Sequence, residues 1–192
     1  MIAIIKYNGG NVSSVQNALN RLDAESIITD DLELIKNTDK VIFPGVGEAS
    51  STMKILKEKG LDQLIPTLKQ PVLGICLGMQ LMCKNNEEGN TVGMGIFDIN
   101  VKKFPSENII PHMGWNTISD LKSTIYSEIK EESDVYFVHS FYCELSENTT
   151  SVCDYILPFS ASLQKDNFYA MQFHPEKSGK IGSQLLQNFL KL

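Results

Sequence analysis

The first 82 residues alternate apolar segments with segments of helical periodicity. Predicted strands cover 2–6, 25–29, 40–43 and 71–73, and predicted helices between them cover about 13–22, 31–35, 50–59 and 61–68. Ser13 or Ser14 is expected to cap the first helix. Strands separated by helices form parallel sheets, so this half predicts a doubly wound sheet with helices on both faces. Ligands of such sheets bind at the carboxyl ends of the strands.

The second half is richer in β patterns. Strands are predicted at 97–104, 134–143, 151–157, 159–164 and 168–173, followed by a helix at about 179–190. The fold class expected is therefore α/β, a flavodoxin-like doubly wound mixed sheet with additional antiparallel strands. With 192 residues and no linker or repeat, the chain is expected to form a single domain over residues 1–192.

Composition excludes several classes of function. The net charge of −6 and scattered basic residues argue against a nucleic-acid surface. The apolar N-terminal run is too short for a signal or membrane helix. The four cysteines have no metal-type spacing, so we expect no metal, no cofactor and reduced thiols in the cytoplasm.

Residues 71–82 are predicted to form a strand, a sharp turn and a helix. Pro71-Val72-Leu73 reads as a buried strand, and Gly74-Ile75-Cys76-Leu77-Gly78 reverses direction before four helix formers. This is the nucleophile-elbow pattern G-x-S-x-G with cysteine in place of serine. A helix N-terminus favours thiolate over thiol, so Cys76 is a candidate nucleophile. The alternative is a buried structural cysteine between packing glycines.

A nucleophilic cysteine needs a base and a group that orients the base. His174 is the best of three histidines, because it follows the strand predicted at 168–173, and Glu176 lies two residues further on. His112 and His139 could both be structural. An isolated His-Pro-Glu would usually be an ordinary turn, but its pairing with an elbow cysteine favours catalysis.

Acyl transfer also needs N–H donors for an oxyanion. The amide of Leu77, directly after the nucleophile, is the expected first donor. The turn Pro44-Gly45-Val46-Gly47 could supply the second through Val46 and Gly47. A plain strand-to-helix turn would have the same composition.

Together these motifs resemble the class I (triad) glutamine amidotransferases, and among them the glutaminase subunits of imidazole glycerol phosphate synthases. The matching stretches span nearly the whole chain in the family's order. They are Lys6-Tyr7-Asn8-Gly9-Gly10-Asn11, Pro44-Gly45-Val46-Gly47, Gly74-Ile75-Cys76-Leu77-Gly78-Met79-Gln80, Glu87-Glu88-Gly89, Pro111-His112-Met113-Gly114-Trp115-Asn116, Tyr136-Phe137-Val138-His139-Ser140-Phe141-Tyr142 and Gln172-Phe173-His174-Pro175-Glu176-Lys177-Ser178.

The resemblance implies a mechanism. Cys76 attacks the side-chain amide of glutamine, His174 carries the proton to the departing ammonia, and Glu176 orients His174. Water then hydrolyses the glutamyl thioester. The family's glutamine contacts correspond to Gly47, Gln80, Glu88, His139, Ser140 and Phe141, with Glu88 meeting the α-ammonium group.

The resemblance also implies a partner. In the family, ammonia passes to a (β/α)8-barrel cyclase subunit, which makes imidazole glycerol phosphate and aminoimidazole-carboxamide ribonucleotide for histidine biosynthesis. Positions that match partner-facing residues are Asn8, Asn11, Trp115, Tyr136 and Lys177. Trp115 could equally be a core aromatic on composition alone.

Three alternatives remain. Paralogues with the same motifs supply ammonia for amidination of bacterial surface sugars. A catalytically silent regulatory binding module would keep the fold, although the intact Cys76, His174 and Glu176 argue against it. An esterase with the same elbow fits poorly, because its acid precedes its histidine.

Overall fold

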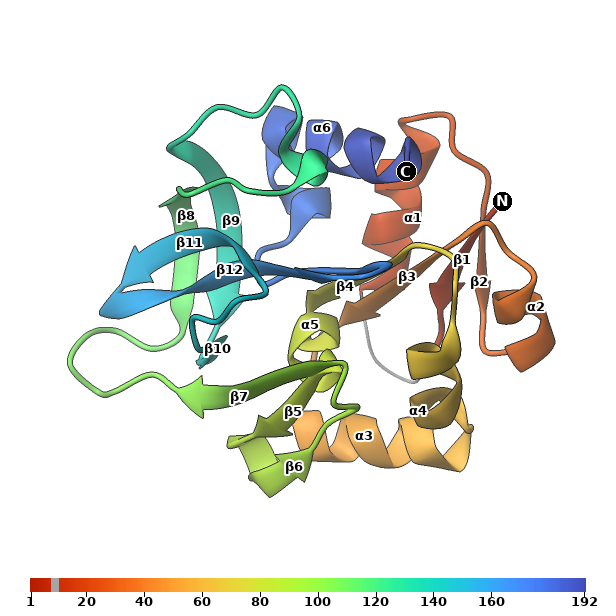
Figure 1. Cartoon of the computed structure of the whole chain (residues 1–192), viewed down its shortest axis with the longest axis horizontal. Helices are drawn as coiled ribbons and strands as arrows, with labels where there is room; N and C mark the ends of the chain where they lie inside the picture. The colour runs from red at the N-terminus through yellow and green to blue at the C-terminus, as the bar shows by residue number, and fades with distance from the viewer. Residues whose placement is uncertain (8–10) are drawn as a thin grey trace.

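A central seven-stranded sheet organises the computed structural model of the chain, which describes residues 1–7 and 11–192 (Figure 1). The strand order is β11-β12-β13-β4-β3-β1-β2. The strands are β1 (Ile2–Ile5), β2 (Ser26–Thr29), β3 (Lys40–Gly45), β4 (Val72–Cys76), β11 (Thr149–Tyr155), β12 (Leu157–Lys165) and β13 (Phe168–Met171). Strands β13, β4, β3, β1 and β2 are parallel, and β12 and β11 extend the sheet antiparallel.

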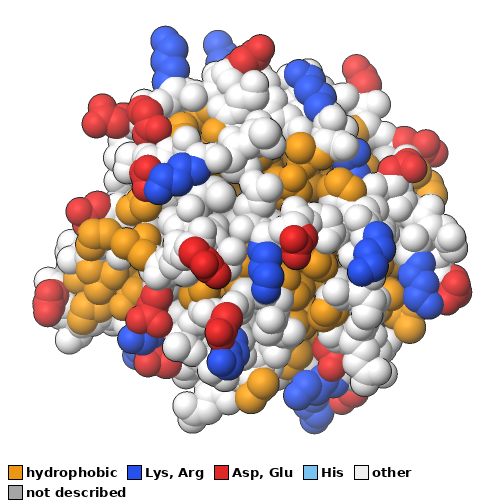
Figure 2. Space-filling model, viewed as in Figure 1, with side chains coloured by type: hydrophobic (Ala, Val, Ile, Leu, Met, Phe, Trp, Pro, Cys, Tyr) orange, Lys and Arg blue, Asp and Glu red, His pale blue; other side chains and the backbone are white. Residues whose placement is uncertain are grey.

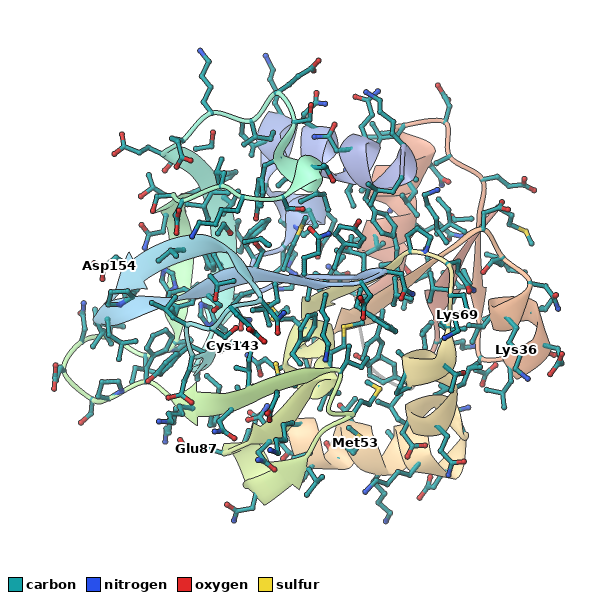
Figure 3. All side chains as sticks on the ribbon, in the orientation of Figure 1. Lys36, Met53, Lys69, Glu87, Cys143 and Asp154 are labelled. Carbon is teal, nitrogen blue, oxygen red and sulfur yellow. The ribbon has the colours of Figure 1, made fainter. Side chains whose placement is uncertain are left out.

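Helices cover both faces of this sheet (Figure 1). One face carries α1 (Val12–Asn20) and α6 (Gly179–Leu190), and the other carries α3 (Ala49–Glu58), α4 (Leu61–Leu64) and α5 (Leu77–Met82), with α2 (Leu32–Lys36) near the edge strand β2. Alternate residues of a strand face opposite sides. Ile2 and Ile4 therefore join the core with α1 and α6, whereas Ala3 and Ile5 join the core with α3. Figure 3 shows Met53 of α3 on this second side.

Two smaller sheets complete the fold. The first has the order β10-β7-β5-β6, with β5 (Cys83–Asn86), β6 (Thr91–Val92), β7 (Phe97–Lys103) and β10 (Phe141–Cys143). The second pairs β8 (His112–Ile118) with β9 (Ser133–His139) in antiparallel register. Short 3-10 helices lie at Ile65–Thr67, Glu88–Asn90, Thr124–Tyr126 and Pro175–Lys177. The predicted fold class is confirmed: a mixed α/β sheet with antiparallel additions.

Two local predictions are wrong, and the sequence did not predict strand β8. The strand expected at 134–143 breaks at Ser140, because its two halves pair with different sheets, β9 with β8 and β10 with β7. The unpredicted strand β8, at 112–118, overlaps the motif quoted at 111–116 and pairs with a strand distant in sequence. Asn11, not a serine, is the N-cap of α1, and its side chain makes no capping hydrogen bond.

The surface in Figure 2 carries scattered acidic and basic side chains, and an apolar patch at the left lies over the connection from β7 to β8. Ile109 in that connection is 78% exposed. None of the helices in residues 1–7 and 11–192 has the length and hydropathy needed to cross a membrane.

Candidate active site

The strand–turn–helix at Cys76 is present, and the turn is concentrated in one residue. Strand β4 runs through Cys76, which has φ 53° and ψ −110°, and α5 begins at Leu77. A non-glycine residue with positive φ is strained and is typically held by its surroundings at functional sites. The surroundings are tight here: a Cβ on Gly78 would lie 2.0 Å from the Phe43 carbonyl oxygen. Strand β3 therefore packs directly on the first turn of α5.

His174 reaches the same end of the sheet from the neighbouring strand. Strand β13 pairs in parallel with β4, with Met171 opposite Ile75, and His174 follows three residues later. The Nδ1 atom of His174 lies 2.8 Å from Glu176 Oε1, and the two side chains are 2% and 1% exposed. A carboxylate only accepts, so Nδ1 carries the proton and Nε2 of the neutral ring keeps its lone pair. Nε2 is buried and has no hydrogen-bond partner among the described residues.

The pKa of His174 is set by opposing effects. Burial lowers it, but interactions with the Cys76 sulfur and the Glu176 carboxylate outweigh burial and raise the pKa to about 10. The raised pKa makes His174 a stronger base than a free imidazole, as a histidine that takes a proton from a cysteine thiol must be.

A cavity of about 390 Å³ opens at this point. Its size suits a small-molecule ligand. It brings together the predicted nucleophile, base, oxyanion donors and glutamine contacts. Pro111 and Val138, which were quoted in motifs without a functional role, also line it. The lining residues are Val46, Gly47, Cys76, Leu77, Gln80, Glu88, Pro111, Val138, His139, Ser140, Phe141 and His174. Glu176 stands behind His174 and outside the lining.

The predicted oxyanion donors lie on two sides of Cys76. Leu77 is the first residue of α5, where backbone N–H groups have no helical acceptor. Val46 and Gly47 follow β3, and Gly47 has a φ of 116°, a conformation that favours glycine. Pairing of β3 with β4 places Gly45 opposite Cys76.

Glu88 is the acidic residue of the cavity. Its Oε2 accepts a hydrogen bond from the backbone N–H of Ala49 at 2.8 Å. Burial is the main effect on its carboxyl group and raises the pKa of Glu88, which the Ala49 hydrogen bond partly opposes. A half-buried carboxylate with one donor has room for a cationic ligand, and an α-ammonium group would supply that charge.

His112 and His139 form a buried pair beside the cavity, and only His139 lines it. His139 Nδ1 donates to the Phe141 carbonyl at 2.7 Å, so its Nε2 must accept from Nδ1–H of His112, 3.0 Å away. Burial lowers the pKa of His112 to about 4 and that of His139 to about 3. Both rings are therefore neutral near pH 7 and hold the backbone at Phe141 in place.

The predicted partner positions have different environments. Trp115 is 58% exposed and packs against Tyr136 across the β8–β9 pair, with ring centroids 6.0 Å apart. The interpretation of Trp115 as a core aromatic is therefore wrong. Lys177 is exposed after His174, Asn11 is half-buried, and Asn8 lies outside the described residues.

A family model described as glutamine amidotransferase class-I matches residues 4–192. The chain belongs to the class I glutamine amidotransferase family. Two relatives are similar along their whole length. This amidotransferase is 59% identical to "Imidazole glycerol phosphate synthase subunit HisH" of Bacteroides fragilis (strain YCH46), covering 100% of this chain and 99% of the relative. It is 45% identical to the protein of the same name from Pasteurella multocida, and the match covers 99% of this chain and 97% of the relative.

Solved structures share the amidotransferase fold at low identity. A putative GMP synthase subunit from Thermoplasma acidophilum gives a TM-score of 0.75 at 19% identity, covering 99% of this chain and 92% of that one. PurLQS from Thermotoga maritima gives a TM-score of 0.70 at 16% sequence identity, and the match covers 99% of this chain and 97% of that one. At such identities the likeness concerns the fold alone.

The structure adds two residues to the neighbourhood of the cavity that the sequence did not single out as functional. Gln172 contacts the Cys76 sulfur, and Asn86 contacts Gln80. Gln172 had one usable signal: it lies two residues before His174, and residues two apart share a face of an extended chain. Asn86 had none, because its place depends on a long-range pairing of β5 with β7.

Proposed function

We propose that this class I amidotransferase is the glutaminase subunit of an imidazole glycerol phosphate synthase. The single observation that carries the glutaminase chemistry is the convergence of Cys76 and His174 in one cavity, with Glu176 on the far ring nitrogen of the histidine. The names of the full-length relatives support the synthase.

The reaction follows from the positions of these groups. The Cys76 thiol passes its proton to Nε2 of His174, and the sulfur attacks the side-chain carbonyl carbon of glutamine. The developing oxyanion accepts hydrogen bonds from the backbone N–H groups of Leu77 and of the Val46–Gly47 turn. His174 returns the proton to the departing nitrogen, which leaves as ammonia. Water then attacks the thioester, with His174 as base, and glutamate departs.

The substrate fits the charges of the cavity. Glu88 binds the α-ammonium group of glutamine, and the segment from His139 to Phe141 forms another part of the cavity wall. Gln80, also a lining residue, holds that wall through its Nε2 donation to the Phe141 carbonyl at 3.0 Å. These roles place the reactive amide of glutamine next to Cys76.

We propose that the ammonia acceptor lies on a separate subunit, because the relatives that match this chain along their length are themselves named as subunits. We propose a (β/α)8-barrel cyclase subunit that docks on the face carrying Trp115, Tyr136 and Lys177, and we propose that Asn8 and Asn11 also contact it. The names of the relatives favour this acceptor over a bacterial surface sugar. The four free thiols fit the cytoplasm.

Glutamate release from glutamine tests the proposal, with purified protein alone and with a barrel cyclase subunit. Cys76→Ala should abolish release while the complex still forms, because the fold does not depend on the thiol. Cys153→Ala removes another buried thiol, on β11 and outside the cavity lining, and should retain turnover. Full turnover by Cys76→Ala would reject the triad. Turnover that no barrel cyclase can couple to imidazole glycerol phosphate would reject the acceptor.

A further inference from the structure

Gln172 lies against the nucleophile without any role in the proton transfer described above. Its side chain is fully buried, and its Nε2 lies 3.7 Å from the Cys76 sulfur, within reach of an N–H···S hydrogen bond. An amide N–H beside sulfur stabilises thiolate, whereas an amide oxygen in the same place would repel it. The orientation of this amide therefore decides what Gln172 does to Cys76.

A chain of hydrogen bonds fixes that orientation. Gln172 Oε1 accepts from Gln80 Nε2 at 3.0 Å, and Gln80 Oε1 accepts from Asn86 Nδ2 at 3.3 Å. Asn86 Oδ1 accepts from the backbone N–H of Glu88 at 2.8 Å. All three amide side chains are buried, with at most 4% of the residue exposed.

Two backbone groups determine the donor-to-acceptor direction of this series of hydrogen bonds. The N–H of Glu88 can only donate, so Asn86 must present its oxygen there and its nitrogen to Gln80. The carbonyl of Phe141 can only accept, and it takes the second Nε2 proton of Gln80 at 3.0 Å. Both groups require the same orientation of Gln80. Gln80 must therefore donate to Gln172, which leaves the Gln172 nitrogen facing the sulfur.

We propose that Gln172 is a further catalytic residue, whose side-chain N–H stabilises the Cys76 thiolate. Gln80 and Asn86 are positioning residues that keep the amide nitrogen of Gln172 directed at the sulfur. The chain links the nucleophile to Glu88, the residue expected to bind the α-ammonium group. The inference rests on Cys76 being the nucleophile of the proposed function.

The test is the pH dependence of Cys76 alkylation by iodoacetamide, read at Cys76 by peptide mass spectrometry, because only thiolate reacts. In Gln172→Leu, which removes the donor, we expect the midpoint to rise by about one to two pH units, the effect of one hydrogen bond to a charged group. Gln172→Glu keeps the shape but adds a negative charge, and its midpoint should rise further. Asn86→Leu, which does not touch the sulfur, removes one of the two groups that orient Gln80 and leaves the Phe141 carbonyl, so its midpoint should rise by less than that of Gln172→Leu.

A matched control is Asn188→Leu. Asn188 is another buried amide, bonded to the carbonyls of Ile125 and Ser127 on the α6 side of the sheet, so its loss should lower stability without moving the midpoint. Unchanged midpoints in folded Gln172→Leu and Gln172→Glu would overturn the proposal. If Cys76→Ala still abolishes glutamate release in that case, the glutaminase assignment stands and only the role of Gln172 fails.

Discussion

The hydroxyl of Tyr7 donates to the carbonyl oxygen of Pro44 at 2.7 Å, in a part of the core that water does not reach. Tyr7 follows β1 and Pro44 lies in β3, at the start of the turn that contains Val46 and Gly47. The ring of Tyr7 also packs edge-on against Phe43, with centroids 5.7 Å apart. One side chain thus connects the end of β1 to the turn beside the nucleophile.

Tyr7→Phe should destabilise the protein by about 1–3 kcal/mol, because the buried Pro44 carbonyl loses its donor. Urea unfolding measures the change. Tyr169→Phe is the control, since Tyr169 lies on β13 with its side chain only half-buried, and it should stay within about 0.5 kcal/mol of the wild type. Equal stability of Tyr7→Phe and the wild type would show that the contact contributes nothing.

Gly78→Ala should lower the free energy of unfolding by at least about 2 kcal/mol, since its Cβ would meet the rigid backbone of β3 at 2.0 Å. Glutaminase activity should fall with it, because the clash pushes the start of α5, and the adjoining Cys76, away from β3. Gly95→Ala is the matched change: it has positive φ but nothing within 4 Å, so the cost should be about 1 kcal/mol of backbone strain. Thermal and urea unfolding of the two variants compare these costs directly.

The buried histidine pair predicts acid sensitivity. The pKa values of His112 and His139 fall to about 4 and 3 on folding, from an unfolded value of about 6.5. The unfolded chain therefore binds more protons than the folded protein below pH 6.5. Stability decreases as the pH is lowered from 6.5, until the pH reaches the pKa values of the folded state. His174 has the opposite sign: its contribution is complete below pH 6.5 and is lost as the pH rises through about 10.

Between pH 7 and pH 5 each of the two neutral histidines should cost about 1–2 kcal/mol of stability. His112→Asn keeps a donor near the Nδ1 position but cannot titrate, so its loss of stability over this range should be roughly half that of the wild type. Urea midpoints at the two pH values give the comparison. An equal loss in variant and wild type would contradict the assignment to this pair.

Trp115→Ala should weaken binding of the proposed barrel partner by about 2 kcal/mol or more, as for a central aromatic of an interface. The free energy of unfolding of the Trp115→Ala variant should differ from that of the wild type by less than about 0.5 kcal/mol, because the Trp115 side chain is mostly exposed. Val92→Ala, exposed on β6, is the control for loss of apolar surface. Titration calorimetry measures the affinity of each variant for the partner. Equal affinities of Trp115→Ala and Val92→Ala would place the interface elsewhere.

Local sequence patterns predicted the doubly wound half of the fold and the elbow at Cys76. Alternating strands and helices each form from neighbouring residues, and the glycines around Cys76 mark a turn whatever lies beyond it. The pairing of Cys76 with His174 also followed from sequence, because parallel strands present their carboxyl ends together. Sequence likewise placed Glu176, which lies only two residues from the histidine it contacts.

Tertiary structure alone decided the break at Ser140 and the strand at His112–Ile118, because both depend on partners distant in the chain. It also decided that His112 and His139 are a neutral structural pair rather than bases, since burial and tautomer depend on groups from three strands. The orientation of Gln172 shows the same limit most clearly. Its amide has a nitrogen end and an oxygen end that the sequence cannot orient. The backbone N–H of Glu88 and the carbonyl of Phe141, acting through Asn86 and Gln80, determine which end meets the sulfur.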